Sequence, residues 1–117
     1  MQIEEIKDLV VNALDDMKAT DITVLDVRER TSFTDWMIIA TGTSSRHVSA
    51  VAGNVEEKAR HSGLRPAGTE GRASSDWVLI DLVDVVVHVM TDQARHFYDL
   101  ERLWGEPSGS EAQQQKP

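Results

Sequence analysis

Apolar side chains recur at two spacings along this chain, and the spacings predict most of its secondary structure. Residues 2–18 carry apolar positions three and four apart with acidic residues between them, which predicts an amphipathic helix. Residues 22–27 alternate and are rich in β-branched side chains, which predicts a strand. Residues 36–41 form a nearly continuous apolar run, typical of a strand in the centre of a sheet, where both faces are buried.

The remaining pattern predicts two helices and a hairpin. A turn at residues 42–45 leads into a second helix, with Thr43 or Ser44 as the N-cap and Gly63 near its end. Residues 76–82 and 84–90 are two strands too close together for anything but a hairpin, and a short extra strand is expected near residues 64–66. Thr91 and Asp92 begin a last helix that runs through Phe97 to Trp104. The buried stripe predicted for the second helix is Val48, Val51, Ala52, Val55 and Ala59.

This order of elements predicts an α/β fold, a mixed sheet of four to five strands flanked by helices. At 117 residues the chain has the size of one domain. From Gly105 onward no aliphatic residue is larger than alanine, so this segment cannot bury enough apolar surface to offset the entropy lost on ordering. We therefore expect a folded domain at residues 1–104 and a disordered tail at residues 105–117.

The predicted hairpin has two different faces. Side chains alternate along a strand, and a two-residue turn at 82–83 or 83–84 places odd positions of the first strand beside even positions of the second. One face is then purely aliphatic and reads as core beneath a helix. The other face is mixed and consists of Trp77, Leu79, Asp81, Val86, His88 and Met90.

Two interpretations of the mixed face remain open from these residues alone. Surfaces that combine apolar, aromatic, His and Met side chains are typical of the centre of a protein interface, and Trp is enriched among its hot spots. Alternatively, a helix covers this face too, and His88 is a core histidine whose ring nitrogens are satisfied. A bulge or a three-residue turn would change the assignment.

Charge favours a protein partner. Twelve basic and 20 acidic residues give a formal charge of −8, whereas domains that hold nucleic acid through its phosphates are usually basic. The chain has no cysteine, which excludes disulfides and thiolate metal sites. No apolar run has the length of a membrane span, and the first residues lack the features of a signal or transit peptide, so we expect a cytoplasmic protein without membrane contact.

Catalysis is the competing hypothesis, and its sharpest form is a nucleotide-binding or nucleotidyltransferase-like enzyme that uses the turn at Gly42–Arg46. A helix N-terminus attracts anions, but the lysine of a P-loop and the glycines of a dinucleotide motif are missing. The candidate carboxylates Asp76, Asp81 and Asp84 do not form the close group that two-metal chemistry requires. The four histidines lack ligand spacing, so we expect no metal and no cofactor.

Six strings, taken in order, are similar to the ribosomal silencing factor family, also called the Iojap family. They lie at residues 25–28, 41–46, 70–71, 77–81, 87–88 and 98–104, the last reading Tyr-Asp-Leu-Glu-Arg-Leu-Trp. The resemblance covers about residues 3–104. It implies a nucleotidyltransferase-like fold without the catalytic carboxylates, and hence a protein that is not an enzyme.

The resemblance also implies a function and a partner. Members of this family bind the large ribosomal subunit through its protein fourteen, which faces the small subunit, and block subunit joining when nutrients are short. It further suggests peripheral contact with ribosomal RNA, a role in late large-subunit maturation, and a homodimer in some members. The partner-binding residues expected on this basis are Glu70, Gly71, Trp77, Leu79, Asp81, His88 and Met90.

One departure from the family pattern lies between the hairpin strands. The family commonly has a glycine there, but this chain has Val83. A primed hairpin turn needs a positive φ, which glycine tolerates and a β-branched residue resists. Either the turn type differs or Val83 is strained.

Overall fold

The computed structural model describes residues 2–29, 31–32, 34–71 and 76–99 of the chain. Its three helices within this part are α1 (Ile3–Asp16), α2 (Ser45–His61) and α3 (Asp92–Tyr98). Its strands there are β1 (Thr20–Asp26), β2 (Trp36–Gly42), β3 (Gly68–Glu70), β4 (Trp77–Asp81) and β5 (Val85–Thr91). The predicted order of helices and strands is therefore confirmed, with a fifth strand between α2 and β4.

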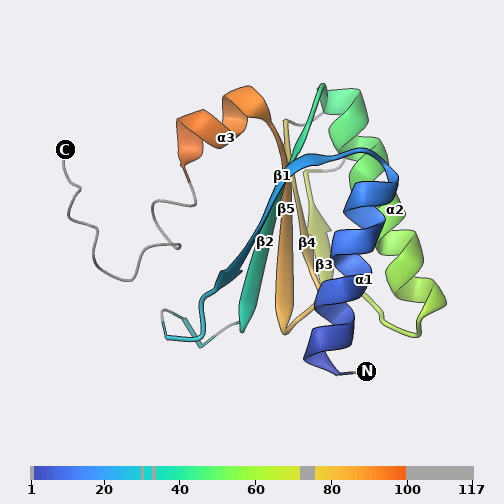
Figure 1. Ribbon diagram of the computed structural model, residues 1–117. Helices are drawn as coiled ribbons and strands as arrows, with labels where there is room; N and C mark the ends of the chain where they lie inside the picture. The colour runs from blue at the N-terminus through green and yellow to red at the C-terminus, as the bar shows by residue number, and fades with distance from the viewer. Residues whose placement is uncertain (1, 30, 33, 72–75, 100–117) are drawn as a thin grey trace.

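The five strands form one mixed sheet in the order β1-β2-β5-β4-β3. Only the β2–β5 pair is parallel among the paired strands described, and the others are antiparallel. Helices α1 and α2 cover one face of the sheet, and α3 lies on the opposite side (Figure 1). We call the face opposite α1 and α2 the second face. The predicted α/β architecture is confirmed.

The main core lies between the sheet and the two long helices. All five residues of the stripe predicted for α2 are fully buried there, with Ile38 and Ala40 from β2 and alternate valines from β5. Because β2 contributes its other alternate residues, Met37 and Ile39, to a smaller cluster on the second face, this strand is buried on both sides. The apolar run at residues 36–41 indicated this in advance.

The hairpin between β4 and β5 has the predicted register. Trp77 pairs with Met90, Leu79 with His88, and Asp81 with Val86, so these six side chains share the second face. The turn consists of Val83 and Asp84, and the Asp84 N–H donates to the Leu82 carbonyl at 2.9 Å. With a φ of 72°, Val83 is the central residue of a γ-turn, a rare and strained turn. The turn therefore differs from the primed type of the family pattern, and Val83 is also strained.

Two other expectations need correction. The extra strand begins at Gly68, not near residues 64–66, since Pro66 has no N–H to give to a ladder and pairing starts where Ala67 donates to Asp81. The last helix ends at Tyr98, because Asp99 adopts a left-handed conformation with a φ of 52°. The predicted continuation to Trp104 and the predicted tail at 105–117 lie outside the described residues.

Candidate partner-binding surface

The sheet register brings most of the predicted site residues together on the second face. Leu79 of β4 pairs with Glu70 of β3 on one side and with His88 of β5 on the other. His88 pairs in turn with Ile39 of β2. These four side chains form a row across the sheet. Trp77 and Met90 lie in the next row toward α3, and Asp81 lies in the row toward the hairpin turn.

Depth separates the predicted residues into two groups. Met90 is fully buried and His88 is 4% exposed, because β5 is the central strand and is flanked on both sides. Trp77, Leu79 and Asp81 are partly exposed on β4, and Glu70 and Gly71 are exposed at the sheet edge. Contact between any of these residues and a partner stays a prediction. Only the residues of β4 and of the sheet edge are accessible to a partner on this surface.

His88 holds the side chain of Trp77 in place. The indole N–H of Trp77 donates to Nδ1 of His88 at 2.9 Å, and the two rings are 5.7 Å apart at 41°. Burial lowers the pKa of His88 to about 4, because desolvation penalises the imidazolium. His88 is thus a buried, neutral histidine whose Nδ1 is hydrogen-bonded, close to the core histidine that the sequence offered as one of two interpretations. It supports the partly exposed Trp77 from below.

Two aromatic side chains of α3 extend the surface around Trp77. The ring of Tyr98 lies 4.5 Å from that of Trp77, and Phe97 contacts Tyr98 edge-on at 4.9 Å. Phe97 is 79% exposed and Tyr98 is 50% exposed. We call Trp77, Phe97 and Tyr98 the aromatic patch.

The sequence did not predict this role for the two α3 residues. Phe97 was expected only as one residue of a longer last helix, with no exposed face assigned to it. Exposed contiguous aromatic surface is uncommon on a soluble protein and marks interaction sites. The signal available in the sequence was Phe-Tyr followed by Asp99, a residue type that tolerates the left-handed conformation ending a helix.

The turn at Gly42–Arg46 is explained without a ligand. Ser44 is the N-cap and accepts from the His47 N–H at 3.1 Å, while the Thr43 N–H donates to Nδ1 of His47 at 2.9 Å. A Cβ on Gly42 would lie 2.8 Å from Cγ2 of Val48, so the close approach of β2 to α2 requires glycine here. Two of the backbone donors that a phosphate could use here, the N–H groups of Thr43 and His47, are occupied within the chain.

The cleft beside this turn is also acidic. It measures about 520 Å³, and its lining includes Asp21, Asp76 and Asp92. In the part of the chain that the structure describes, no three acidic or histidine side chains are grouped so that they could hold a metal ion. The geometry therefore does not favour nucleotidyl transfer, and Asp81 and Asp84 belong to the distant hairpin end.

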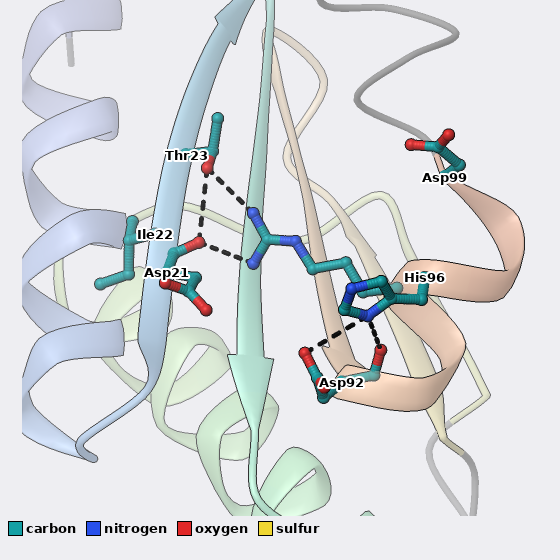
Figure 2. Close-up of a pocket in the computed structure, with 7 residues that line it drawn as sticks. Asp21, Ile22, Thr23, Asp92, His96 and Asp99 are labelled. Atoms are coloured by element: carbon teal, nitrogen blue, oxygen red, sulfur yellow. Dashed lines mark hydrogen bonds and ion pairs between the residues drawn. The ribbon is translucent and has the colours of Figure 1, made fainter.

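A second cleft, shown in Figure 2, lies between β1 and α3. Asp21 and Thr23 stand on one side, Asp92 and His96 on the other. Arg95 crosses beneath it and donates to the Asp21 carbonyl and to the hydroxyls of Thr23 and Thr41, at 2.6, 2.9 and 2.8 Å. These bonds join α3 to the bulge in β1 and so fix the position of the aromatic patch. None of the helices in the described ranges has the length and apolar character of a membrane span.

Comparison with known proteins gives concordant results. The family model described as ribosomal silencing factor during starvation matches residues 1–117. A ribosomal silencing factor from Chromobacterium violaceum is 48% identical over 105 residues, covering 90% of this chain and 86% of the relative. One from Haemophilus influenzae is 45% identical over 97 residues, covering 83% and 95%.

A eukaryotic protein and a solved structure are also similar. The mouse protein named mitochondrial assembly of ribosomal large subunit protein 1 is 33% identical over 100 residues, which span 83% of this chain and 44% of the mouse protein. A crystal structure of a Chromobacterium violaceum protein superposes with a TM-score of 0.88 at 45% identity, covering 93% of this chain and 92% of that one.

Proposed function

Because the chain belongs to the ribosomal silencing factor family, we propose that it represses translation by binding the large ribosomal subunit and blocking the joining of the small subunit. The contact in this proposal is the large-subunit protein fourteen, and the repression operates in starved or stationary cells. The names of the bacterial relatives support a regulator of the ribosome. The name of the mouse relative supports the large subunit as partner and a role in its assembly.

The aromatic patch is the observation that carries this proposal. Trp77, Tyr98 and Phe97 form a continuous, partly exposed surface on the second face, next to Leu79. Aromatic side chains supply large contact area at the centre of protein interfaces and dominate their binding energy. Since His88 and Arg95 fix the two elements that carry the patch, little ordering is needed on binding.

Charge supports a basic protein as the partner. The chain carries a formal charge of −8, and Glu70 and Asp81 lie on the second face beside Leu79. Acidic groups around an apolar centre steer a basic partner into place and disfavour other partners. The proposed repressor acts by occupying the surface and needs neither cofactor nor catalysis. It acts in the cytoplasm, and a homodimer would have to leave the aromatic patch free.

Sedimentation tests the proposal directly. The purified protein is mixed with isolated large subunits or with assembled ribosomes, and the pellet is assayed for the protein. We expect binding to the isolated subunit and exclusion from the assembled ribosome. Adding small subunits to large subunits preloaded with the protein should yield fewer joined ribosomes. Equal binding to both particles would contradict a block on joining.

A pair of tryptophan variants locates the contact. Trp77→Ala should abolish sedimentation with large subunits and binding to isolated protein fourteen, since truncating a central Trp commonly costs about 2 kcal/mol or more. Trp36→Ala is the matched control, because the Trp36 ring lies on the helix-covered side, 3.6 Å from Nζ of Lys7. Both variants are checked for folding by thermal melting. A folded Trp77→Ala that still sediments would remove the aromatic patch from the contact.

A further inference from the structure

One carboxyl group lies inside the apolar layer between α2 and the sheet. Glu56 is 3% exposed and stands between Ala52 and Ala59 in the buried stripe of α2. An apolar residue would continue this stripe, whereas removing a carboxyl group from water costs free energy unless the group is hydrogen-bonded. The apolar pattern of the sequence did not single out Glu56. Its burial therefore needs a compensating interaction.

A hydrogen bond joins this carboxyl group to the edge strand of the sheet. The hydroxyl of Thr69 in β3 donates to Oε2 of Glu56 at 2.5 Å. Thr69 pairs with Ile80, whose side chain is buried in the main core beneath the helices. Since residues directly opposite each other in a ladder share a face, the Thr69 side chain points to the α2 side of the sheet. By alternation, Glu70 lies on the second face beside Leu79.

The other side chains of β3 do little to set its register. β3 is the edge strand, has three residues and pairs only with β4 in the part of the chain that the structure describes. Gly68 has no side chain, and Glu70 is exposed, so burial does not distinguish its place from neighbouring ones. Short strands of this kind are prone to slippage, and a slip by one residue moves every side chain to the other face. The hydrogen bond of Thr69 is therefore the side-chain contact that distinguishes the observed register.

We propose that Glu56 is a positioning residue of the partner-binding surface. By accepting from Thr69 it sets the register of β3 and keeps Glu70 beside Leu79, where Glu70 meets a basic partner. In a strand slipped by one residue, Glu70 would face α2 and its charge would be withdrawn from the surface. Glu56 itself does not touch the partner, because it is buried beneath the opposite face of the sheet. The effect on binding rests on the proposed function, whereas the effect on register follows from the fold alone.

Nuclear magnetic resonance measures the register directly. The wild-type chain should show backbone nuclear Overhauser effects across the pair Thr69–Ile80. Glu56→Met removes the acceptor at similar volume and should lose these signals, whereas Glu56→Gln keeps an oxygen acceptor and should retain them. Signals across the pair Val78–Val89 should persist in both variants and show that the β4–β5 ladder is intact. A native β3 ladder in Glu56→Met overturns the proposal.

Substitutions on β3 keep the test decisive if Glu56→Met does not fold. Thr69→Ala removes the donor and should lose the signals to Ile80, whereas Thr69→Ser keeps the hydroxyl and should retain them. A native ladder in Thr69→Ala overturns the proposal. The matched control Glu57→Met removes the next carboxylate of α2 from an exposed position and should leave the ladder intact. Loss of the ladder in Glu57→Met would assign the effect to charge on α2 and overturn the role of Glu56.

A double-mutant cycle measures the consequence for binding. Glu70→Gln should weaken binding to large subunits about threefold, the size typical of one exposed charge. Glu56→Met should weaken it at least as much. Glu70→Gln should have no further effect in the Glu56→Met background, because Glu70 then no longer faces the partner. Additive effects of the two substitutions would overturn the positioning role.

The register and the proposed function fail separately in these experiments. If the wild-type chain does not sediment with large subunits, the proposed function fails, and the β3 ladder in Glu56→Met still decides whether Glu56 sets the register. If Glu56→Met keeps the native ladder, the positioning role fails, and sedimentation of the wild-type chain still tests the proposed function. Loss of the ladder together with a non-additive loss of binding is the result expected.

Discussion

Trp77 donates its indole N–H to Nδ1 of His88 across the β4–β5 ladder at 2.9 Å. Because Nδ1 accepts this bond, His88 is the neutral tautomer with its proton on Nε2. Protonation would turn Nδ1 into a donor that faces another donor, in a site where the imidazole is 4% exposed. The orientation of the tryptophan in the aromatic patch therefore depends on a histidine that stays uncharged.

Stability should fall on mild acidification because of His88. Its pKa is lowered from 6.5 to about 4 in the folded chain, so between these values the unfolded chain takes up a proton that the folded chain does not. The stabilisation is complete above pH 6.5 and is lost as the pH falls toward 4. From pH 7.5 to 5 the free energy of unfolding should drop by about 2 kcal/mol from this group.

Denaturant unfolding of wild type and His88→Gln at both pH values isolates this effect. Glutamine offers an oxygen acceptor to the Trp77 N–H and does not titrate, so the variant should lack the drop. The carboxylate of Asp26 does not interfere, because its hydrogen bonds from Arg28 lower its pKa to about 2 and its effect falls below pH 4. An equal drop in both proteins would refute the assignment to His88.

Replacing Val83 by glycine should stabilise the chain. A β-branched residue at a φ of 72° carries strain of about 1–3 kcal/mol, whereas glycine costs about 0.5–1 kcal/mol of backbone entropy. Val83 is 56% exposed, so little burial is lost. The free energy of unfolding should rise by about 1 kcal/mol. Val24→Gly is the matched control at an exposed strand position and should lower it; a fall in both variants would show that the turn is unstrained.

The sequence pattern predicts which face of the sheet a side chain is on, but not how deeply it is buried. Strand alternation placed Trp77, Leu79 and His88 on one face, and the ladder confirms the register. Alternation does not give depth. The burial of His88 and Met90 follows from the position of β5 between β2 and β4, which is a property of the topology and not of the hairpin.

The exposed aromatic residues could not be predicted, for a different reason. Phe97 was predicted within a longer last helix, but α3 ends one residue later at Tyr98. That end depends on the left-handed conformation of Asp99, which a short polar residue permits but does not dictate. Helix boundaries are decided by such local competition, so periodicity alone did not predict the end of α3.

Gly42→Ala should destabilise the fold. An added Cβ would lie 2.8 Å from Cγ2 of Val48 and 3.1 Å from its backbone nitrogen, so α2 would have to move away from β2. The cost of overpacking, about 1–3 kcal/mol, exceeds the gain of up to about 1 kcal/mol from a less flexible unfolded chain. Gly68→Ala is the control, since its Cβ would meet nothing within 4 Å. Denaturant unfolding should show a loss only for Gly42→Ala.

Substitution of Phe97 should weaken binding to large subunits with little effect on the stability of the fold. Its ring is 79% exposed and contacts Tyr98, so folding gains little from it. Phe97→Ser should therefore change the free energy of unfolding by no more than about 0.5 kcal/mol. Loss of an aromatic anchor commonly costs about 2 kcal/mol of binding, so affinity for large subunits should fall about 30-fold.

Val24→Ser is the control for Phe97→Ser, because Val24 is an exposed apolar residue of β1 that points away from the second face. It should leave affinity for large subunits unchanged, and titration of labelled protein into large subunits measures both variants. Equal affinity of Phe97→Ser and wild type would confine the contact to Trp77 and the sheet. A parallel loss in Val24→Ser would show that exposed apolar area, rather than the aromatic patch, controls binding. If Phe97→Ser loses affinity for large subunits and Val24→Ser does not, α3 is part of the docking surface.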